Sequence, residues 1–255
     1  MKVKVLGFAG AEFPGFHPPG FLIDGKLLLD AGTIGASLSE NDQWKIRHIF
    51  ITHAHLDHIK GIPFLADNII IKNKTHNVTV IGIAPVLKTL KKNLLNNKIW
   101  PDFTVIPSPK NAVLKFVEIG AGRTIQLNGY KVTAYRVNHA VPAAGYVVED
   151  EKGKKLLYTG DTGPTNTIWE KACSVKIHRA IIEVSFPNRM EALALETGHL
   201  TPKLLKKEIG KMKIIPDEIL VTHPKPQHIK IITNEIKRLR MPEVRLLKDG
   251  EVINI

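Results

Sequence analysis

Three histidines within six residues constrain this chain more than any other feature of its sequence. His53, His55 and His58 lie within the sequence THAHLDH, and Asp57 lies among them. The apolar residues 47–51 come directly before this cluster and predict a strand that ends there. Alternate side chains of an extended segment point to the same side, so His53 and His55 can bind one cation together. If the chain turns into a helix at Asp57, that carboxylate and His58 can face a second cation.

Three further candidate ligands follow the cluster, and each lies where a predicted strand ends. They are His139, Asp161 in the sequence TGDTG, and His223 in the sequence VTHP. Each of them alone is as well explained as an ordinary loop residue, but their shared position at strand ends favours a common site. Imidazole nitrogen and carboxylate oxygen are ligands that suit zinc, manganese and iron.

We therefore predict two divalent metal ions, with zinc as the first choice and manganese or iron as alternatives. The first ion takes His53, His55 and His139, the second takes Asp57, His58 and His223, and Asp161 bridges them. Such a pair lowers the pKa of a bridging water or hydroxide towards neutrality and offsets charge that builds on a phosphoryl group. The sequence therefore predicts a metal-dependent hydrolase, in which Asp57 also counts as a catalytic residue.

The composition is that of an ordinary globular protein. Of 255 residues, 44% are hydrophobic and 24% are charged, which excludes disordered, collagen-like and coiled-coil chains. Apolar runs are too short to span a bilayer, so we expect no membrane partner. The single cysteine, Cys173, excludes a disulfide framework and a site of several thiolates, and the cytoplasm is the expected compartment.

The alternation of strands and helices predicts a layered α/β architecture in one domain over residues 1–255. Strands are expected at residues 2–6, 47–51, 78–83, 131–137, 146–149 and 155–158. Helices are expected at 85–96, 201–209 and 226–239. An Asp-Gly pair predicts a hairpin over 21–30, and a second Asp-Gly pair predicts another that joins 244–247 to 252–255.

Several motifs together give the chain a family resemblance. The sequence HAHLDH, followed by the isolated His139, Asp161 and His223, resembles the metallo-β-lactamase fold superfamily, and DAGT at residues 30–33 adds to the likeness. This resemblance implies a four-layer αβ/βα sandwich, in which two mixed sheets are flanked by helices and the metals lie at the sheet edge. A bridging carboxylate at Asp161 resembles the hydrolases of phosphodiesters or thioesters more than the β-lactamases.

Finer motifs resemble the class II cyclic-nucleotide phosphodiesterases. They are HAHLDHIKG from His53, NNKIWPDF from Asn96, EVSFPN from Glu183, GHLTP from Gly198, and Lys225-Pro226 after the last predicted ligand. The resemblance implies hydrolysis of a 3′,5′-cyclic nucleotide, cyclic AMP or cyclic GMP, to a 5′-nucleotide. The expected partner is thus a small anionic phosphodiester, and a homodimer is compatible with this interpretation.

Five residues outside the ligand set are candidates for further roles. His199, held protonated by Glu183, is the candidate proton donor to the departing oxygen, as in the similar arrangement of tRNA 3′-processing endonucleases. Thr162 and Lys225 are candidates for holding phosphate oxygens, and each is equally explained by a structural role. Trp100 is a candidate for stacking on a base, although a place in the core is the favoured interpretation for an aromatic residue beside an amphipathic helix.

Alternative functions stay open at this point. The net charge of +12 favours anionic partners and makes RNA 3′-end processing of the ribonuclease Z type an alternative. Thioester hydrolysis is a weaker alternative, because no helical substrate region is evident at the end of the chain. A non-catalytic metal-binding scaffold is the alternative from a different class, and the complete ligand set argues against it.

Overall fold

Two mixed β-sheets form the centre of the molecule. The computed structural model describes residues 1–72, 76–127 and 129–255. In the first sheet the strand order is β14-β1-β2-β3-β4-β5-β6, and in the second it is β13-β12-β11-β10-β9-β8-β7. In each sheet one half is antiparallel and the other half parallel.

The strands and helices have the following bounds. The first sheet consists of β1 (Lys2–Gly7), β2 (Gly20–Ile23), β3 (Leu27–Leu29), β4 (His48–Phe50), β5 (Val78–Gly82), β6 (Leu114–Glu118) and β14 (Val252–Asn254). The second consists of β7 (Thr124–Leu127), β8 (Tyr130–Arg136), β9 (Ala144–Asp150), β10 (Lys155–Tyr158), β11 (Arg179–Glu183), β12 (Glu218–Thr222) and β13 (Val244–Leu246). The α-helices are α1 (Glu40–Gln43), α2 (Leu56–Ile59), α3 (Gly61–Lys72), α4 (Ala84–Thr89), α5 (Thr167–Ala172), α6 (Glu191–Thr197), α7 (Pro202–Ile209) and α8 (Ile229–Arg238). Single turns of other helix types are η1 (Leu90–Leu94, π) and the 3₁₀ turns η2 (Pro109–Asn111), η3 (Asn188–Met190) and η4 (Pro226–His228).

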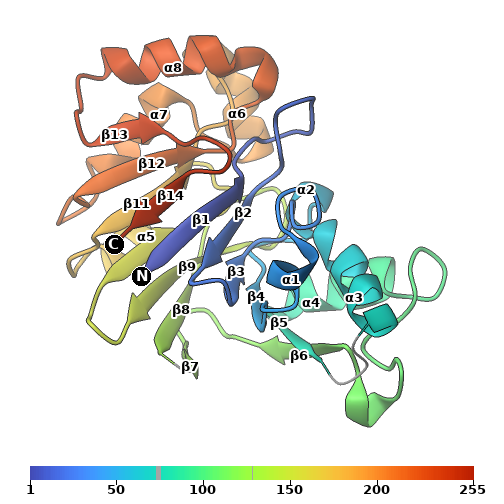
Figure 1. The fold of residues 1–255 in the computed structure, drawn as a ribbon. Helices are drawn as coiled ribbons and strands as arrows, with labels where there is room; N and C mark the ends of the chain where they lie inside the picture. The colour runs from blue at the N-terminus through green and yellow to red at the C-terminus, as the bar shows by residue number, and fades with distance from the viewer. Residues whose placement is uncertain (73–75, 128) are drawn as a thin grey trace.

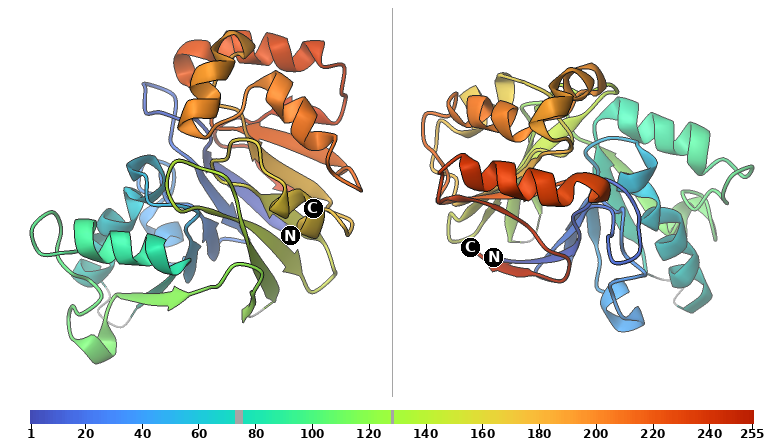
Figure 2. Two further views of the ribbon diagram at one scale, coloured as in Figure 1. Left: turned by 180° about the vertical axis from the view of Figure 1, so that it is seen from behind. Right: turned by 90° about the horizontal axis from the view of Figure 1, so that it is seen from above.

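Helices cover the outer faces of both sheets. Helices α1 to α4 lie on the side of the first sheet, and α5 to α8 lie on the side of the second (Figures 1 and 2). Alternate residues of the strands serve the two faces: Ala180 and Ile182 of β11 pack into the core under α5, α7 and α8, whereas Ile181 packs into the core between the sheets. The predicted four-layer αβ/βα sandwich is confirmed.

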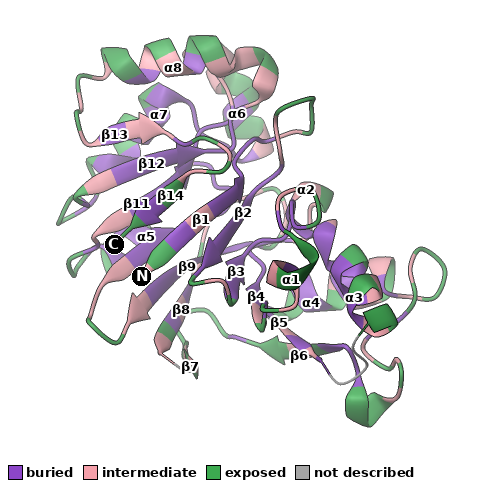
Figure 3. Cartoon of the chain, in the orientation of Figure 1, coloured by how far each residue is buried: buried purple, intermediate pink, exposed green. Residues whose placement is uncertain are grey.

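The inner strands of both sheets, such as β2, β3, β11 and β12, are largely buried, whereas the edge strands β6 and β7 and the outer sides of helices such as α8 and α3 carry exposed positions (Figure 3). The predicted helix starting at Thr201 is present, and the hydroxyl of Thr201 caps it by accepting the Leu204 N–H at 3.3 Å. The predicted helix over 226–239 is present as η4 and α8. The predicted helix over 85–96 is α4 followed by the π turn η1. Within the described ranges, no helix combines the length and apolar character that a membrane span requires.

The predicted C-terminal hairpin is wrong, because its two strands belong to different sheets. Strand β13 pairs with β12 in parallel, whereas β14 pairs with β1 in antiparallel fashion. The carboxylate of Asp249 accepts the backbone N–H groups of Phe8 and His17, both at 3.1 Å, and Gly250 N–H donates to the Val5 carbonyl at 2.9 Å. These bonds direct the chain across from the second sheet to the first.

The topology brings several strand ends to one edge of the sandwich. Strands β10, β11 and β12 are parallel, and β8 runs in the same direction because it is two antiparallel steps from β10. In the first sheet, β3 and β4 are parallel as well. The segments that follow the carboxyl ends of these strands carry the predicted site residues.

Candidate metal centre

The histidine cluster lies in the turn between β4 and α2. His53 lies three residues after the strand, His55 is the extended N-cap residue of α2, and Asp57 and His58 lie in the single turn of this helix. His53 and His58 are fully buried. The chain thus turns from an extended residue into a helix here, which is the condition that the sequence analysis set for Asp57 and His58 to face a second cation.

The first group of candidate ligands contains three imidazoles whose nitrogens face one another. His53 Nε2 lies 3.0 Å from His55 Nδ1, and His139 Nε2 lies 3.3 Å from the same atom. One ligand atom each from these histidines and from Asp161 lies within 4.8 Å of all the others. The structure thus brings together the three residues predicted for the first ion.

The second group contains Asp57, His58 and His223, whose ligand atoms also lie within 4.8 Å of one another. His223 Nε2 is 3.4 Å from His58 Nε2 and 3.3 Å from Asp57 Oδ2. His223 comes directly after β12 and has a left-handed backbone, with a φ of 66°, which turns its side chain into the group. The residues predicted for the second ion are therefore neighbours too.

Asp161 lies between the two groups. Its Oδ2 is 3.7 Å from His53 Nε2 in the first group, and its Oδ1 is 3.4 Å from His58 Nε2 in the second. Oδ2 also lies 3.3 Å from His223 Nε2. This carboxylate therefore has the position that a bridging ligand requires.

The spacing of these atoms fits divalent cations. In a tetrahedral site with metal–nitrogen bonds of about 2.0–2.1 Å, the ligand atoms lie about 3.3 Å apart. The nitrogen–nitrogen distances within the two groups are 3.0, 3.3 and 3.4 Å. Nitrogen and carboxylate oxygen are also the ligand types that zinc, iron and manganese accept. The clustered residues can thus hold divalent metal ions.

Hydrogen bonds on the far side of the rings orient the histidines. His58 Nδ1–H donates to Asp30 Oδ2 at 2.7 Å, and His139 Nδ1–H donates to the Gly198 carbonyl at 2.9 Å. His53 Nδ1 lies 3.0 Å from the hydroxyl of Thr52. In each ring the outer bond occupies Nδ1 and leaves the Nε2 lone pair for the group, as is usual for metal-binding histidines.

Asp30 accepts several of the hydrogen bonds that support the histidine rings from outside the centre. Its Oδ1 accepts the Thr52 N–H at 2.8 Å, and its Oδ2 accepts the hydroxyls of Thr52 and Tyr158 at 2.8 and 2.7 Å in addition to His58. The residue is fully buried and has a left-handed backbone with a φ of 54°. The sequence analysis used the motif DAGT only for the family resemblance and missed this role, although a carboxylate directly after a strand was a signal.

A glycine lets Asp161 approach the histidine turn. Gly160 has a left-handed backbone, with a φ of 59°, and a Cβ atom at this position would lie 2.6 Å from the side chain of Thr52. A side chain here would therefore displace Thr52, which contacts both Asp30 and His53.

Burial and neighbouring charges shift the pKa values of these groups in different directions: burial alone would lower the pKa of His58, but the carboxylates of Asp161 and Asp30 raise it well above its usual value. Burial and the neighbouring imidazole of His58 hold the pKa of His53 well below its usual range, so this ring is neutral. Burial alone would raise the pKa of Asp161, but the imidazoles of His223 and His58 bring it well below its usual value. Burial alone would also raise the pKa of Asp57, but the neighbouring imidazoles of His223 and His58 together lower it below its usual value.

His199 and Glu183 form a buried pair beside this centre. Glu183 Oε1 lies 2.8 Å from His199 Nδ1, as the sequence analysis expected of an acid and its partner. Burial alone would lower the pKa of His199, but the charge and hydrogen bond of Glu183 raise it above its ordinary value. His199 also forms a group with Asp161 and His223, whose ligand atoms lie within 4.8 Å of one another.

The three predicted substrate contacts have other partners in the structure. The Thr162 hydroxyl donates to the Gly163 carbonyl at 2.8 Å, and the Lys225 ammonium donates to the Gly10 carbonyl at 2.5 Å. The Trp100 ring packs edge-on against Phe64 of α3, with ring centroids 5.1 Å apart. Their roles toward a substrate stay predictions.

A small apolar pocket opens beside the first group of ligands. It has a volume of about 130 Å³, and His55 forms part of its wall. The remaining wall is formed by Ala54, by Pro85, Val86 and Thr89 of α4, and by Val141 and Pro142 after β8. The pocket therefore places an apolar surface directly against a candidate metal ligand.

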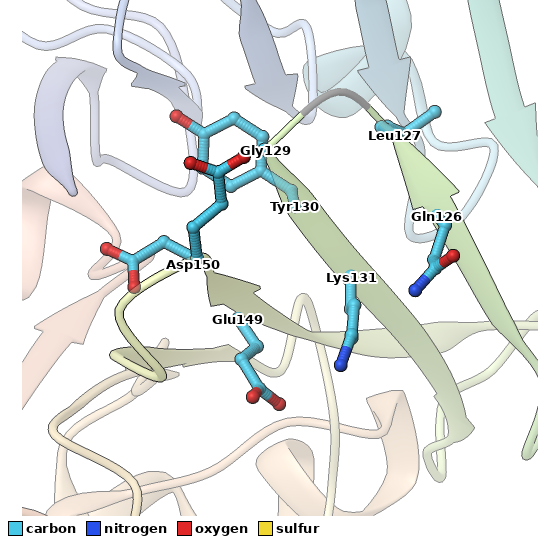
Figure 4. A pocket seen from close by; sticks show the side chains of 8 residues that line it. Gln126, Leu127, Gly129, Tyr130, Lys131, Glu149 and Asp150 are labelled. Carbon is cyan, nitrogen blue, oxygen red and sulfur yellow. The ribbon is translucent and has the colours of Figure 1, made fainter.

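A larger cavity of about 410 Å³ lies at the opposite end of the second sheet, where β7, β8 and β9 meet (Figure 4). Tyr130, Glu149 and Asp150 line it. Asp150 binds the amino terminus at 3.2 Å and Glu149 binds Lys155 at 3.3 Å, so these carboxylates already have partners. Of these two cavities, the smaller one adjoins the candidate centre.

Comparison with known proteins identifies the family. A family model described as a beta-lactamase superfamily domain matches residues 27–224. The chain belongs to this superfamily. The matched range contains every predicted metal ligand and the Glu183–His199 pair.

Individual members of the beta-lactamase superfamily show how far the similarity extends. The chain is 27% identical, over 71% of its length, to 57% of a probable 3′,5′-cyclic-nucleotide phosphodiesterase of Yersinia pestis. It therefore spans little more than half of the cyclic-nucleotide phosphodiesterases that it matches. It is also 27% identical to a ribonuclease Z of Methanococcus maripaludis, over 97% of this chain and 96% of that protein. Among solved structures, unliganded yeast PDE1 has the same fold, with a TM-score of 0.83 and 17% identity over 100% of this chain and 99% of that one.

We predict that Asp30→Ala lowers the free energy of unfolding by at least about 3 kcal/mol, because it leaves several buried donors without an acceptor. Urea unfolding measures the change. The control is Asp217→Ala, which removes an exposed carboxylate paired with Lys176 and should cost less than about 1 kcal/mol. Equal losses in the two variants would contradict the central role of Asp30.

Proposed function

We propose that the protein is a metal-dependent phosphodiesterase that hydrolyses 3′,5′-cyclic nucleotides to 5′-nucleotides. The position of the Glu183–His199 pair beside the candidate metal centre carries this proposal. The similarity to proteins named cyclic-nucleotide phosphodiesterases supports the substrate class. When bound, two divalent cations would supply an activated water and offset the charge of the phosphoryl oxygens.

The residues of the chain supply the proton that the reaction needs. Attack of water on phosphorus breaks the bond to O3′, which leaves as an alkoxide unless a proton is delivered. Glu183 accepts the Nδ1–H of His199, so the Nε2 of this ring is free to carry a proton towards the leaving oxygen. Because Glu183 raises the pKa of His199, the ring retains that proton to a higher pH than an ordinary histidine does.

The apolar pocket beside His55 offers a contact surface for the base of such a substrate. Thr89 is the polar residue of its wall other than His55, and its hydroxyl donates to the Pro85 carbonyl at 2.9 Å. The wall therefore offers apolar contact to a planar base, and the Thr89 hydroxyl, already hydrogen-bonded, is not free to bind the polar edge of that base. This arrangement suits a single nucleoside next to a phosphodiester.

RNA 3′-end processing is the second candidate function. The net charge of +12 and the nearly full-length similarity to a ribonuclease Z favour it. The alignment to that ribonuclease is 306 positions long, against 255 residues here, so the ribonuclease has segments without a counterpart in this chain. A small substrate requires no such additional contacts.

An activity panel on zinc- and manganese-loaded protein tests the assignment. It compares cyclic AMP, cyclic GMP, an aryl phosphodiester, a tRNA precursor, a thioester and a β-lactam. We expect the highest kcat/KM for the cyclic nucleotides. Preferred cleavage of the tRNA precursor would support the second candidate, and retained metal without hydrolysis of any substrate would indicate a binding scaffold.

We predict that His199→Ala lowers kcat for a cyclic nucleotide by about 100- to 10,000-fold, because the leaving oxygen loses its proton donor. Metal content, measured by inductively coupled plasma mass spectrometry, should not change. His228→Ala, which removes a histidine at the start of α8, is the control and should retain wild-type kcat. Full activity of His199→Ala would exclude the acid role.

The charge of Glu183 should set the alkaline limb of the pH profile. The pKa of His199 is raised, so its acid form persists above the ordinary histidine pKa of 6.5 and is lost as pH rises through the raised value. Glu183→Gln removes the charge that raises this pKa, so the alkaline limb of kcat should move to lower pH. An unchanged limb would show that another group controls it.

We predict that cyclic AMP and cyclic GMP have kcat/KM values within about tenfold of each other, because apolar walls discriminate weakly between bases. Val141→Trp, which narrows the pocket, should raise KM for both substrates alike. Steady-state kinetics with the two nucleotides provides the measurement. A preference above a hundredfold would mean that polar groups outside this pocket read the base.

A further inference from the structure

Ser185 lies at the junction of the candidate metal centre and the Glu183–His199 pair. It follows β11 by two residues and is fully buried. Its hydroxyl oxygen lies 2.8 Å from His223 Nδ1, 3.1 Å from Glu183 Oε2 and 3.1 Å from His199 Nδ1. One hydroxyl thus contacts a predicted metal ligand, the proposed acid and the partner of that acid.

The chemistry of the neighbours fixes the direction of these hydrogen bonds. Both oxygens of Glu183 already accept backbone N–H groups, from Thr162 at 3.2 Å and from Leu200 at 3.3 Å. An ionised carboxylate only accepts, so the single proton of Ser185 goes to Glu183 Oε2. The lone pairs of the hydroxyl then remain for His223 Nδ1–H and, more weakly, for His199 Nδ1–H.

This direction determines which nitrogen of His223 is free. With its proton on Nδ1, His223 presents the Nε2 lone pair to the second ligand group, where Asp57 Oδ2 and Asp161 Oδ2 each lie 3.3 Å away. The opposite tautomer would place a proton on Nε2, where a cation has to bind. A metal ligand therefore depends on the direction of one hydrogen bond.

The first ligand group contains the same arrangement. There the hydroxyl of Thr52 donates to Asp30 Oδ2 at 2.8 Å and is left to accept His53 Nδ1–H at 3.0 Å. In both groups a buried carboxylate orients a hydroxyl, and the hydroxyl orients an imidazole. Two segments far apart in the sequence thus orient a histidine ring through the same carboxylate–hydroxyl–imidazole chain of hydrogen bonds.

We propose that Ser185 is a positioning residue that holds His223 in its metal-binding tautomer and links the second metal site to the Glu183–His199 pair. This inference rests on the metal sites of the proposed function. Ser185 does not act as a nucleophile, because its hydroxyl is enclosed by these three side chains and fully buried. Its removal should therefore affect metal binding and proton delivery together.

Metal affinity provides a test that is independent of turnover. Zinc binding to wild type and to Ser185→Ala is measured by competition with a chromophoric chelator. We expect one of the two ions to bind about 10- to 100-fold more weakly to Ser185→Ala, as is typical when the outer partner of a ligand is lost. Ser185→Thr, which retains the hydroxyl, should recover most of the affinity. Ser37→Ala, which removes a half-buried hydroxyl that donates to the Leu6 carbonyl at 2.8 Å, should bind both ions as wild type does.

A measurement on the wild-type chain keeps the proposal testable if Ser185→Ala does not fold. Nitrogen-15 chemical shifts of zinc-free wild type, at a pH where the histidines are neutral, should show His223 as the Nδ1–H tautomer. An Nε2–H tautomer, or wild-type affinity for both ions in Ser185→Ala, would overturn the proposal. Failure of wild type to bind two ions would instead contradict the metal sites themselves.

Discussion

The buried carboxylate of Asp30 is the interaction on which the rest of the centre depends. It joins the end of β3 to Thr52 after β4, to His58 on α2 and to Tyr158 of β10, and so connects the two sheets at the edge that carries the site. A buried charge is stable only where donors surround it, and four hydrogen bonds meet that requirement here. The same bonds orient the histidine turn.

A second buried carboxylate, Glu183, is also surrounded by hydrogen-bond donors and lies at the end of β11, in the parallel half of the second sheet. It receives two backbone N–H groups, the hydroxyl of Ser185 and the imidazole of His199. The carboxylates of Asp30 and Glu183 therefore lie on the outer sides of the histidine rings, whereas those of Asp57 and Asp161 lie among the ring nitrogens that face the centre. This separation keeps the nitrogens that face the centre available as ligands and gives His199 a raised pKa beside them.

Much of the site could be predicted from the sequence, because parallel strands bring their carboxyl ends to one edge and the residues directly after them are local features. His139, Asp161 and His223 were found in this way, and Glu183 was matched to His199. The pairing of β13 and β14 could not be predicted, since an Asp-Gly turn between two short apolar segments does not reveal whether they join the same sheet. The contacts of Ser185 arise from residues 14 and 38 positions away, which no local pattern records.

The central claim is that side chains from distant strand ends converge to hold two divalent cations. Native mass spectrometry of protein loaded with zinc and freed of excess metal measures the number of ions per chain directly. The account predicts two ions for wild type and a reduced number when Asp161, the residue between the two groups, is replaced by alanine. Wild-type protein that carries no bound zinc, or an Asp161→Ala variant that retains both ions with unchanged affinity, would contradict it.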